Sequence, residues 1–124
     1  MTDTSEQATK QMAEQLADLD GAEPQADASD AEYKAQVDRL IATWRTWIDE
    51  MIVQLDLGRM DVRDEAGAVA HRLENAWLSL KNEAERLGAD ADTSATDLRR
   101  DVGTLLGDLR RAAGTAVDRL WASR

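Results

Sequence analysis

Large apolar residues recur every three or four positions along most of the chain, as they do in amphipathic α-helices. The strongest such stretch runs from Val37 to Leu57 and holds two of the four tryptophans. At about 100° per residue its apolar side chains fall on one broad face, and Trp47 lies at the edge of that face. The positions on the face are Val37, Leu40, Ile41, Trp44, Ile48, Met51, Ile52 and Leu55.

Two further stretches repeat the pattern, which predicts three main helices at about 30–57, 61–88 and 94–122. Ser29 with Glu32 fits a capping box before the first helix, and Gly58 and Gly88 fit the ends of the first and the second. We therefore expect an all-α fold, either an antiparallel helical bundle or a coiled coil. The inward positions of the second and third helices are Val62, Ala66, Val69, Leu73, Trp77, Leu80, Ala84, Leu87, Leu98, Val102, Leu105, Leu109, Ala112, Ala113, Ala116 and Leu120.

Gly58 leaves two arrangements open. If the chain turns there, the first two helices pack side by side in a bundle. If Gly58 lies inside one helix, that helix runs to Leu87 and is about 85 Å long. The apolar stripe keeps its phase through Gly58, which favours the second arrangement. The stripe from Trp44 to Leu55 would then be uncovered, and a second copy of the chain would be needed to bury it.

The N-terminal region, residues 1–29, has a much weaker pattern. A marginal helix is predicted at 4–20, because only Ala8, Met12, Leu16 and Leu19 form a thin apolar stripe. Residues 21–29 are predicted to be a linker. We expect a flexible acidic tail beside a bundle domain at 30–124, with a docked helix as the alternative.

Charge is unevenly distributed along the chain, whose net charge is −10. Residues 1–32 carry nine acidic residues against one lysine, whereas residues 97–124 carry four acidic residues against six arginines. The tail could therefore lie over the arginines of the last helix, Arg99, Arg100, Arg110 and Arg111. The overall negative charge disfavours nucleic acids and anionic membranes as partners.

Several classes of protein are excluded by composition. The chain has no cysteine, so it has neither disulfides nor thiolate metal sites. The N-terminal residues lack the apolar segment of a signal peptide, and no run approaches the roughly 20 apolar residues of a membrane span. We therefore expect a cytoplasmic protein.

The phrase from Trp47 to Asp61 places an apolar helix before Val-Gln, then Leu-Gly, a basic residue, Met and an acid. In these 15 or so residues the chain resembles small bacterial all-helical coiled-coil proteins of unknown function. The resemblance implies a helical, coiled-coil fold and no activity.

The sequence offers no catalytic, cofactor-binding or metal-binding residues. His71, the single histidine, is predicted on the polar side of its helix, and the residue three positions before it is Ala68 rather than a glutamate ligand. Carboxylates such as Asp49 have a basic residue, here Arg45, three or four positions away, which predicts ordinary surface pairs. Gly103 and Gly107 fit either neutral surface glycines or a second surface for close helix packing.

These patterns favour a non-enzymatic helical interaction or self-association protein, with a homodimer partner or another helical protein. The alternatives are an amphipathic protein that binds lipid surfaces or apolar ligands, and an acidic decoy that inhibits a basic partner protein. No cofactor, small-molecule substrate or nucleic acid is expected. The predicted interaction seam consists of Val37, Ile41, Trp44, Trp47, Ile48, Met51, Ile52, Leu55, Val69, Leu73 and Trp77.

Overall fold

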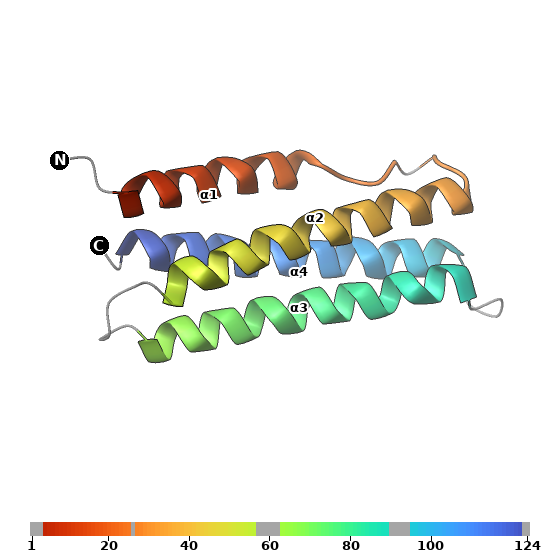
Figure 1. Ribbon diagram of the computed structural model, residues 1–124. Coiled ribbons are helices and arrows are strands. Elements are labelled where there is room, and N and C mark those ends of the chain that lie inside the picture. Colours follow the sequence, from red (N-terminus) through yellow and green to blue (C-terminus); the bar gives the residue numbers. More distant parts are fainter. Residues whose placement is uncertain (1–3, 26, 57–62, 90–94, 123–124) are drawn as a thin grey trace.

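The computed structural model describes residues 4–25, 27–56, 63–89 and 95–122, and these residues form four helices. They are α1 (Thr4–Gly21), α2 (Asp30–Asp56), α3 (Arg63–Ala89) and α4 (Ala95–Ala122). Successive helices run in opposite directions and lie along one another as a bundle (Figure 1). The all-α bundle is confirmed. The prediction of three main helices is wrong, because the N-terminal region, expected to be a flexible tail, supplies a fourth helix that packs on α2 and α4.

The α2 and α3 helices lie side by side, so the alternative of one continuous helix through Gly58 is wrong. The indole N–H of Trp77 on α3 donates a hydrogen bond to the carbonyl oxygen of Ile41 on α2, at 2.9 Å. These residues would lie more than 50 Å apart along a continuous helix, since each residue adds about 1.5 Å. Gly58 itself, and the inward position Val62, lie outside the described residues.

The ends of α2, α3 and α4 agree with the predicted ranges to within two residues. The Ser29 half of the predicted capping box before α2 is confirmed, since the backbone N–H of Glu32 donates to the Ser29 hydroxyl oxygen at 3.2 Å. The backbone N–H of Tyr33 also donates to the Ser29 carbonyl oxygen, at 2.8 Å. A side-chain cap satisfies an otherwise unpaired N–H, which is why this boundary could be predicted locally.

One hydrophobic core runs through the bundle and takes side chains from all four helices. Its fully buried members include Trp44, Ile48 and Met51 of α2 and Leu73 and Leu80 of α3. The α4 helix contributes a wider face than its predicted stripe, because Leu106 and Val117 are buried as well. These two lie four residues before and seven residues after Arg110, so all three share one flank of α4.

The α1 helix is buried along one side only. Met12, Leu16 and Leu19 point into the core, as does Thr9, which is 1% exposed. An 18-residue helix with so few large apolar residues is marginal in isolation. Its helical state therefore depends on the surface against which it packs, and a local pattern cannot reveal that surface.

Candidate interaction site

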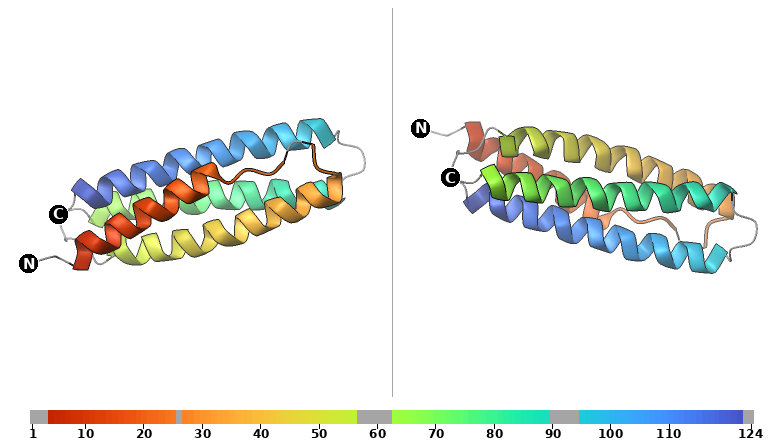
Figure 2. Two further views of the ribbon diagram at one scale, coloured as in Figure 1. Left: turned by 90° about the horizontal axis from the view of Figure 1, so that it is seen from above. Right: turned by 90° about the horizontal axis from the view of Figure 1, so that it is seen from below.

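The α1 helix packs on α2 and α4 and, among the described residues, has no packing contact with α3. Seen from above, it lies across the side of the bundle between α2 and α4, and a non-helical connection leads from it to the start of α2 (Figure 2). We call α1 the arm helix, residues 22–29 the tether, and the side of α2 and α4 under the arm helix the docking face. Residue 26 of the tether lies outside the described part.

Trp47 is the main contact of the docking face with the arm helix. Its indole N–H donates to the carbonyl oxygen of Met12 at 3.0 Å, although the two residues are 35 positions apart. Its ring meets that of Trp44 edge to face, with the centroids 5.7 Å apart and the planes at 78°. The face of α2 under the arm helix is therefore aromatic, a geometry that adds roughly 0.5–1.5 kcal/mol beyond area burial.

The indole N–H of Trp44 is buried and has no hydrogen-bond acceptor in the described part of the chain. Trp44 itself is fully buried. An unpaired buried donor costs about 1–3 kcal/mol, because it gives up its hydrogen bond to water and gains none in exchange. The core beneath the arm helix thus carries a local cost that its apolar contacts offset.

Two arginines of α4 hold the tether at its two ends, and we call them the clasps. Arg110 donates to the Glu23 carboxylate at 2.9 Å and to the Ala22 carbonyl oxygen at 3.4 Å. Arg99 donates to the Ala28 carbonyl oxygen at 2.7 Å and to the Asp30 carboxylate at 3.0 Å.

The ring of Tyr33 supports the second clasp. The Arg99 guanidinium carbon lies 4.4 Å from the Tyr33 ring centroid, a cation–π contact. Burial raises the pKa of the Tyr33 hydroxyl, with Arg99 acting in the opposite direction. The phenol therefore stays neutral near pH 7 and does not compete with the tether for the positive charge of Arg99.

The spacing of the clasps explains why both reach the tether. Arg99 and Arg110 are eleven residues apart, which is about three helical turns and about 16 Å along α4. They consequently share one face. The prediction that the acidic N-terminal region lies over the arginines of the last helix is confirmed for these two. Arg100 and Arg111 pair instead with Asp97 and Asp108 of α4 itself.

A groove of about 580 Å³ runs between the arm helix and α2. Apolar atoms dominate its lining, with Leu19, Leu40 and Trp47 as the large side chains. Asp18 and Glu50 are its charged residues. The groove marks the edge along which the arm helix would separate from α2.

The predicted seam residues lie in the core of the single chain rather than on its surface. Ile52 and Trp77 are half-buried, and the other nine are buried. The structure brings all of them together with side chains of α1 and α4, so the chain's own helices cover the stripe from Trp44 to Leu55.

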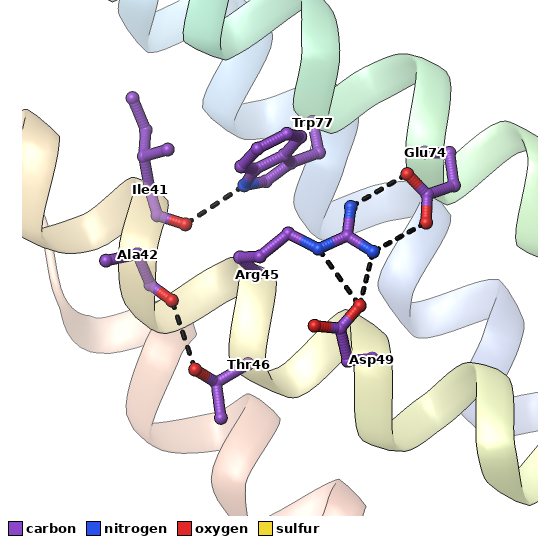
Figure 3. A network of polar contacts seen from close by, with 7 residues as sticks. All are labelled: Ile41, Ala42, Arg45, Thr46, Asp49, Glu74 and Trp77. Carbon is purple, nitrogen blue, oxygen red and sulfur yellow. Dashed lines mark hydrogen bonds and ion pairs between the residues drawn. The ribbon is translucent and has the colours of Figure 1, made fainter.

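A polar cluster joins α2 to α3 on the side of the bundle formed by these two helices (Figure 3). Arg45 donates two hydrogen bonds of 2.7 Å to the Glu74 carboxylate and further ones to Asp49. Its guanidinium carbon lies 4.9 Å from the Trp77 ring centroid, and the Lys81 ammonium lies 5.5 Å from the same centroid. We call the contacts among Arg45, Glu74 and Trp77 the brace.

The electrostatics of the brace favour the charged forms of both Arg45 and Glu74. The hydrogen bond to Arg45 lowers the pKa of Glu74, and those to Glu74 and Asp49 raise the pKa of Arg45. Both groups are thus fixed in their charged forms near neutral pH, whereas a catalytic acid or base needs a pKa near the working pH. The Arg45–Asp49 pair agrees with the predicted surface pairing.

Other candidate chemistry does not assemble in the described part of the chain. His71 is exposed, as predicted from its place on the helix. Within the described ranges, no three His, Asp or Glu side chains come close enough together to hold a metal ion. None of the helices described carries an apolar stretch that could cross a bilayer.

Sequence reasoning predicted the linker at 21–29 but missed the second flank of α4, where Leu106 and Val117 are buried. A second spacing signal was present, because Leu106, Arg110, Ala113 and Val117 follow one another at intervals of four, three and four residues. Such a row beside the main apolar stripe indicates that a second neighbour packs on the same helix.

The comparisons with known proteins give no relative. No protein-family model matches the chain, and no curated protein or solved structure is significantly similar to it.

Proposed function

We propose that the protein is a non-enzymatic helical interaction protein, and that the docking face is its recognition surface. One observation carries the proposal: the chain already binds a short, weakly amphipathic helix on this face, through Met12, Leu16 and Leu19. A helix laid along an apolar face is a common mode of peptide recognition, with anchors at positions i, i+4 and i+7. Met12, Leu16 and Leu19 have this spacing.

The contacts of the arm helix also suit reversible binding. Its anchors are few, and a connection of eight residues, 22–29, separates it from α2. The clasps hold the tether through partly exposed ion pairs, which contribute about 1 kcal/mol or less each and weaken with salt. A helix held in this way can leave its face without breaking the brace between α2 and α3.

The proposal can be tested by supplying the arm in trans. A fluorescently labelled peptide of residues 4–30 is titrated with the full chain, and its anisotropy is measured. We expect weak saturable binding to the natural chain, whose own arm competes, and tighter binding to a Leu16→Glu chain, whose arm helix is displaced.

Two controls make this titration decisive. A Leu16→Glu peptide should not bind, and far-UV circular dichroism should show that the Leu16→Glu chain has lost no more helix than α1 supplies. If the variant loses more, the natural chain with excess peptide serves as the receptor. An absence of saturable binding to a folded receptor would contradict the proposal.

A second candidate function, binding of an apolar ligand, is favoured by the groove between α1 and α2. Its volume of about 580 Å³ lies within the range of roughly 300–1,000 Å³ that small-molecule sites occupy. Trp47 lines this groove, so a bound apolar ligand or a neutral vesicle should shift tryptophan emission to shorter wavelength. An unchanged spectrum at every ratio of lipid to protein would remove this candidate.

A further inference from the structure

We propose that the arm is exchangeable, and that the docking face of one copy accepts the arm helix of a second copy of the same chain. The inference rests on the proposed function and names its partner. The product would be a reciprocal dimer in which each arm crosses to the other copy and makes there the contacts it makes here within one chain.

The first step of the argument is that the arm can be separated from the rest. The arm helix packs on α2 and α4, whereas α3, which makes the most extensive contacts with both of those helices, does not take part in its docking. The brace and the hydrogen bond from Trp77 to Ile41 lie between α2 and α3. When the arm leaves, the contacts between α2 and α3 therefore remain in place.

The second step concerns the reach of the tether. Eight extended residues span up to about 28 Å, whereas the clasps that hold the tether's ends are about 16 Å apart along α4. Pro24 lacks a backbone N–H and disfavours helix in the residue before it, so the tether resists merging α1 and α2 into one helix. It can redirect the arm while keeping it a separate element.

The third step explains why a second copy suits the docking face. The Met12 carbonyl oxygen accepts from the same Trp47, and Glu23 pairs with the same Arg110, whichever chain supplies the arm. Asp30 is the first residue of α2 and stays with its own Arg99. Exchange of identical elements preserves these contacts, so it is a low-cost route to a dimer. Residues 1–32 carry strong negative charge while residues 97–124 carry net positive charge, so an incoming arm is attracted to the helix that receives it.

The same charges make exchange depend on salt. Each copy carries a net charge of −10, so two copies repel one another at low ionic strength. Added salt weakens the clasps within one chain, which speeds opening, but these contacts are the same in monomer and dimer and do not change the balance between them. Salt also screens the repulsion between copies, which promotes encounter and favours the dimer. We therefore expect the dimer to form faster, and to a greater extent, in 0.5 M salt than at low salt.

A crosslinking experiment tests the exchange directly, because the chain contains no natural cysteine. Asp18 of the arm helix and Thr46 of α2 line the same groove and are exposed. Full-length Asp18→Cys and Thr46→Cys chains are mixed at high concentration, incubated, and treated with a short bismaleimide. We expect covalent heterodimers, seen as a shift from 13.7 kDa to twice that mass.

Two matched mixtures show whether the arm makes the link. Ser79→Cys places a thiol on exposed α3, away from the arm helix, so mixing it with Asp18→Cys should give far less heterodimer. Adding Leu16→Glu to the Asp18→Cys chain removes the arm's central anchor and should abolish crosslinking to Thr46→Cys. Circular dichroism should show the full helix content for the chains with a cysteine alone, and no loss beyond what α1 supplies for the chain that also carries Leu16→Glu.

The outcomes separate the exchange from the proposed function. Equal crosslinking in the Thr46→Cys and Ser79→Cys mixtures would overturn arm exchange, since the copies would then meet through another surface. A chain that sedimentation shows to be monomeric at every concentration, yet binds the arm peptide in trans, would overturn exchange and leave the docking face as a recognition surface. A monomer that also ignores the peptide would overturn both.

Discussion

The α2 helix packs on α3 on one side and on the arm helix on the other, and the two sides make different kinds of contact. Towards α3, the brace adds charge-assisted hydrogen bonds and cation–π contacts to the apolar core. Towards the arm helix, Trp47 donates a hydrogen bond to the Met12 backbone carbonyl, and the apolar side chains of Met12, Leu16 and Leu19 are buried beside it. Contacts between charged side chains hold the first side, and a bond from a side chain to the backbone holds the second.

The two contacts of α2 also differ in the length of the helix that packs on it. The paired helices α2 and α3 have 27 residues each, whereas α1 has 18. A longer helix buries more apolar surface along its partner, and burial stabilises by roughly 25 cal/mol per Å². Further polar contacts keep the arm near the bundle through the tether, where Arg99, Arg110 and Gln36 provide them. The bundle therefore divides into two parts: a braced set, which consists of α2, α3 and α4, and the docked arm helix.

The largest effect is expected from Trp44→Ala combined with Met51→Ala, which attacks the part of α2 on which both contacts depend. Both side chains are fully buried. Truncating a buried Trp or Met costs about 2–5 kcal/mol each, and the sum approaches the total stability of roughly 5–15 kcal/mol of a typical domain. We expect loss of cooperative thermal unfolding by circular dichroism. His71→Ala, at an exposed position, is the matched control and should leave the melting curve unchanged.

The next largest effect compares the same substitution, leucine to alanine, on α3 and on the arm helix. Leu73→Ala on α3 removes a fully buried side chain and should cost about 2–5 kcal/mol throughout the bundle. Leu16→Ala on the arm helix removes a side chain that is 8% exposed, and its cost should appear mainly as local opening of α1. Hydrogen exchange by mass spectrometry measures both.

For Leu73→Ala we expect faster exchange in all four helices, and for Leu16→Ala faster exchange confined to α1 and the tether. Tryptophan emission gives a second readout, because Trp47 lies under the arm helix and should shift to longer wavelength when the arm opens. If Leu16→Ala accelerated exchange equally in α3, the division into a braced set and an arm would be wrong.

A smaller effect is expected from Glu74→Gln, which weakens the brace and leaves the arm unchanged. The half-exposed pair with Arg45 should contribute about 1 kcal/mol or less at neutral pH. The pKa of Glu74 is lowered in the folded chain, so the stabilisation is fully present above the unfolded pKa of about 4.3 and is lost as the pH falls through the folded value. Chemical denaturation at several pH values measures the difference between the two chains.

We expect that difference to be constant from pH 7 to about pH 5 and to shrink towards zero below pH 4. Asp38→Asn is a suitable control, since its exposed carboxylate pairs with Lys34 within α2 and joins no second helix. A difference between Glu74→Gln and the natural chain that grew on acidification would contradict the assigned role.

Local signals explain how much of this fold could be predicted from sequence. Ser29 and Glu32 determine the start of α2 through a bond between neighbours, and the stripe from Val37 to Leu55 determines its buried face by spacing alone. The pair of Arg45 with Asp49 lies within one helix, so it too was accessible. The partner Glu74 was not, because it depends on how two helices align.

The arm could be anticipated only in part. The helix at 4–20 and its stripe were predicted, and so was attraction between the acidic N-terminal region and the last helix. The sequence favours a flexible tail and leaves docking as the alternative, because docking depends on the face that Trp47 and the second flank of α4 create after the other helices have packed. The phase agreement across Gly58 was misleading, because separate helices can present matching stripes to the same core.

The smallest predicted effect concerns close approach on the arm side of the bundle. Gly103 lies four residues after Arg99 and seven before Arg110, on the face of α4 that carries the clasps. A glycine there would matter if the tether needed its space, yet a Cβ built at Gly103 meets no other described atom within 4 Å. Gly103→Ala should therefore stabilise the chain by roughly 0.5–1 kcal/mol through helix propensity, with the clasps intact.

Gly67→Ala on α3 is the matched substitution on the braced side, because a Cβ at that position also meets nothing within 4 Å. Equal gains in the free energy of unfolding, measured by denaturant titration, would show that neither side uses glycine for close packing. If Gly103→Ala instead stabilised the monomer less than Gly67→Ala and accelerated exchange in the tether, the tether would pack more closely on α4 than its two clasps require. The arm would then be held by contact along its length, and the distinction between a braced set and a separable arm would have to be drawn elsewhere.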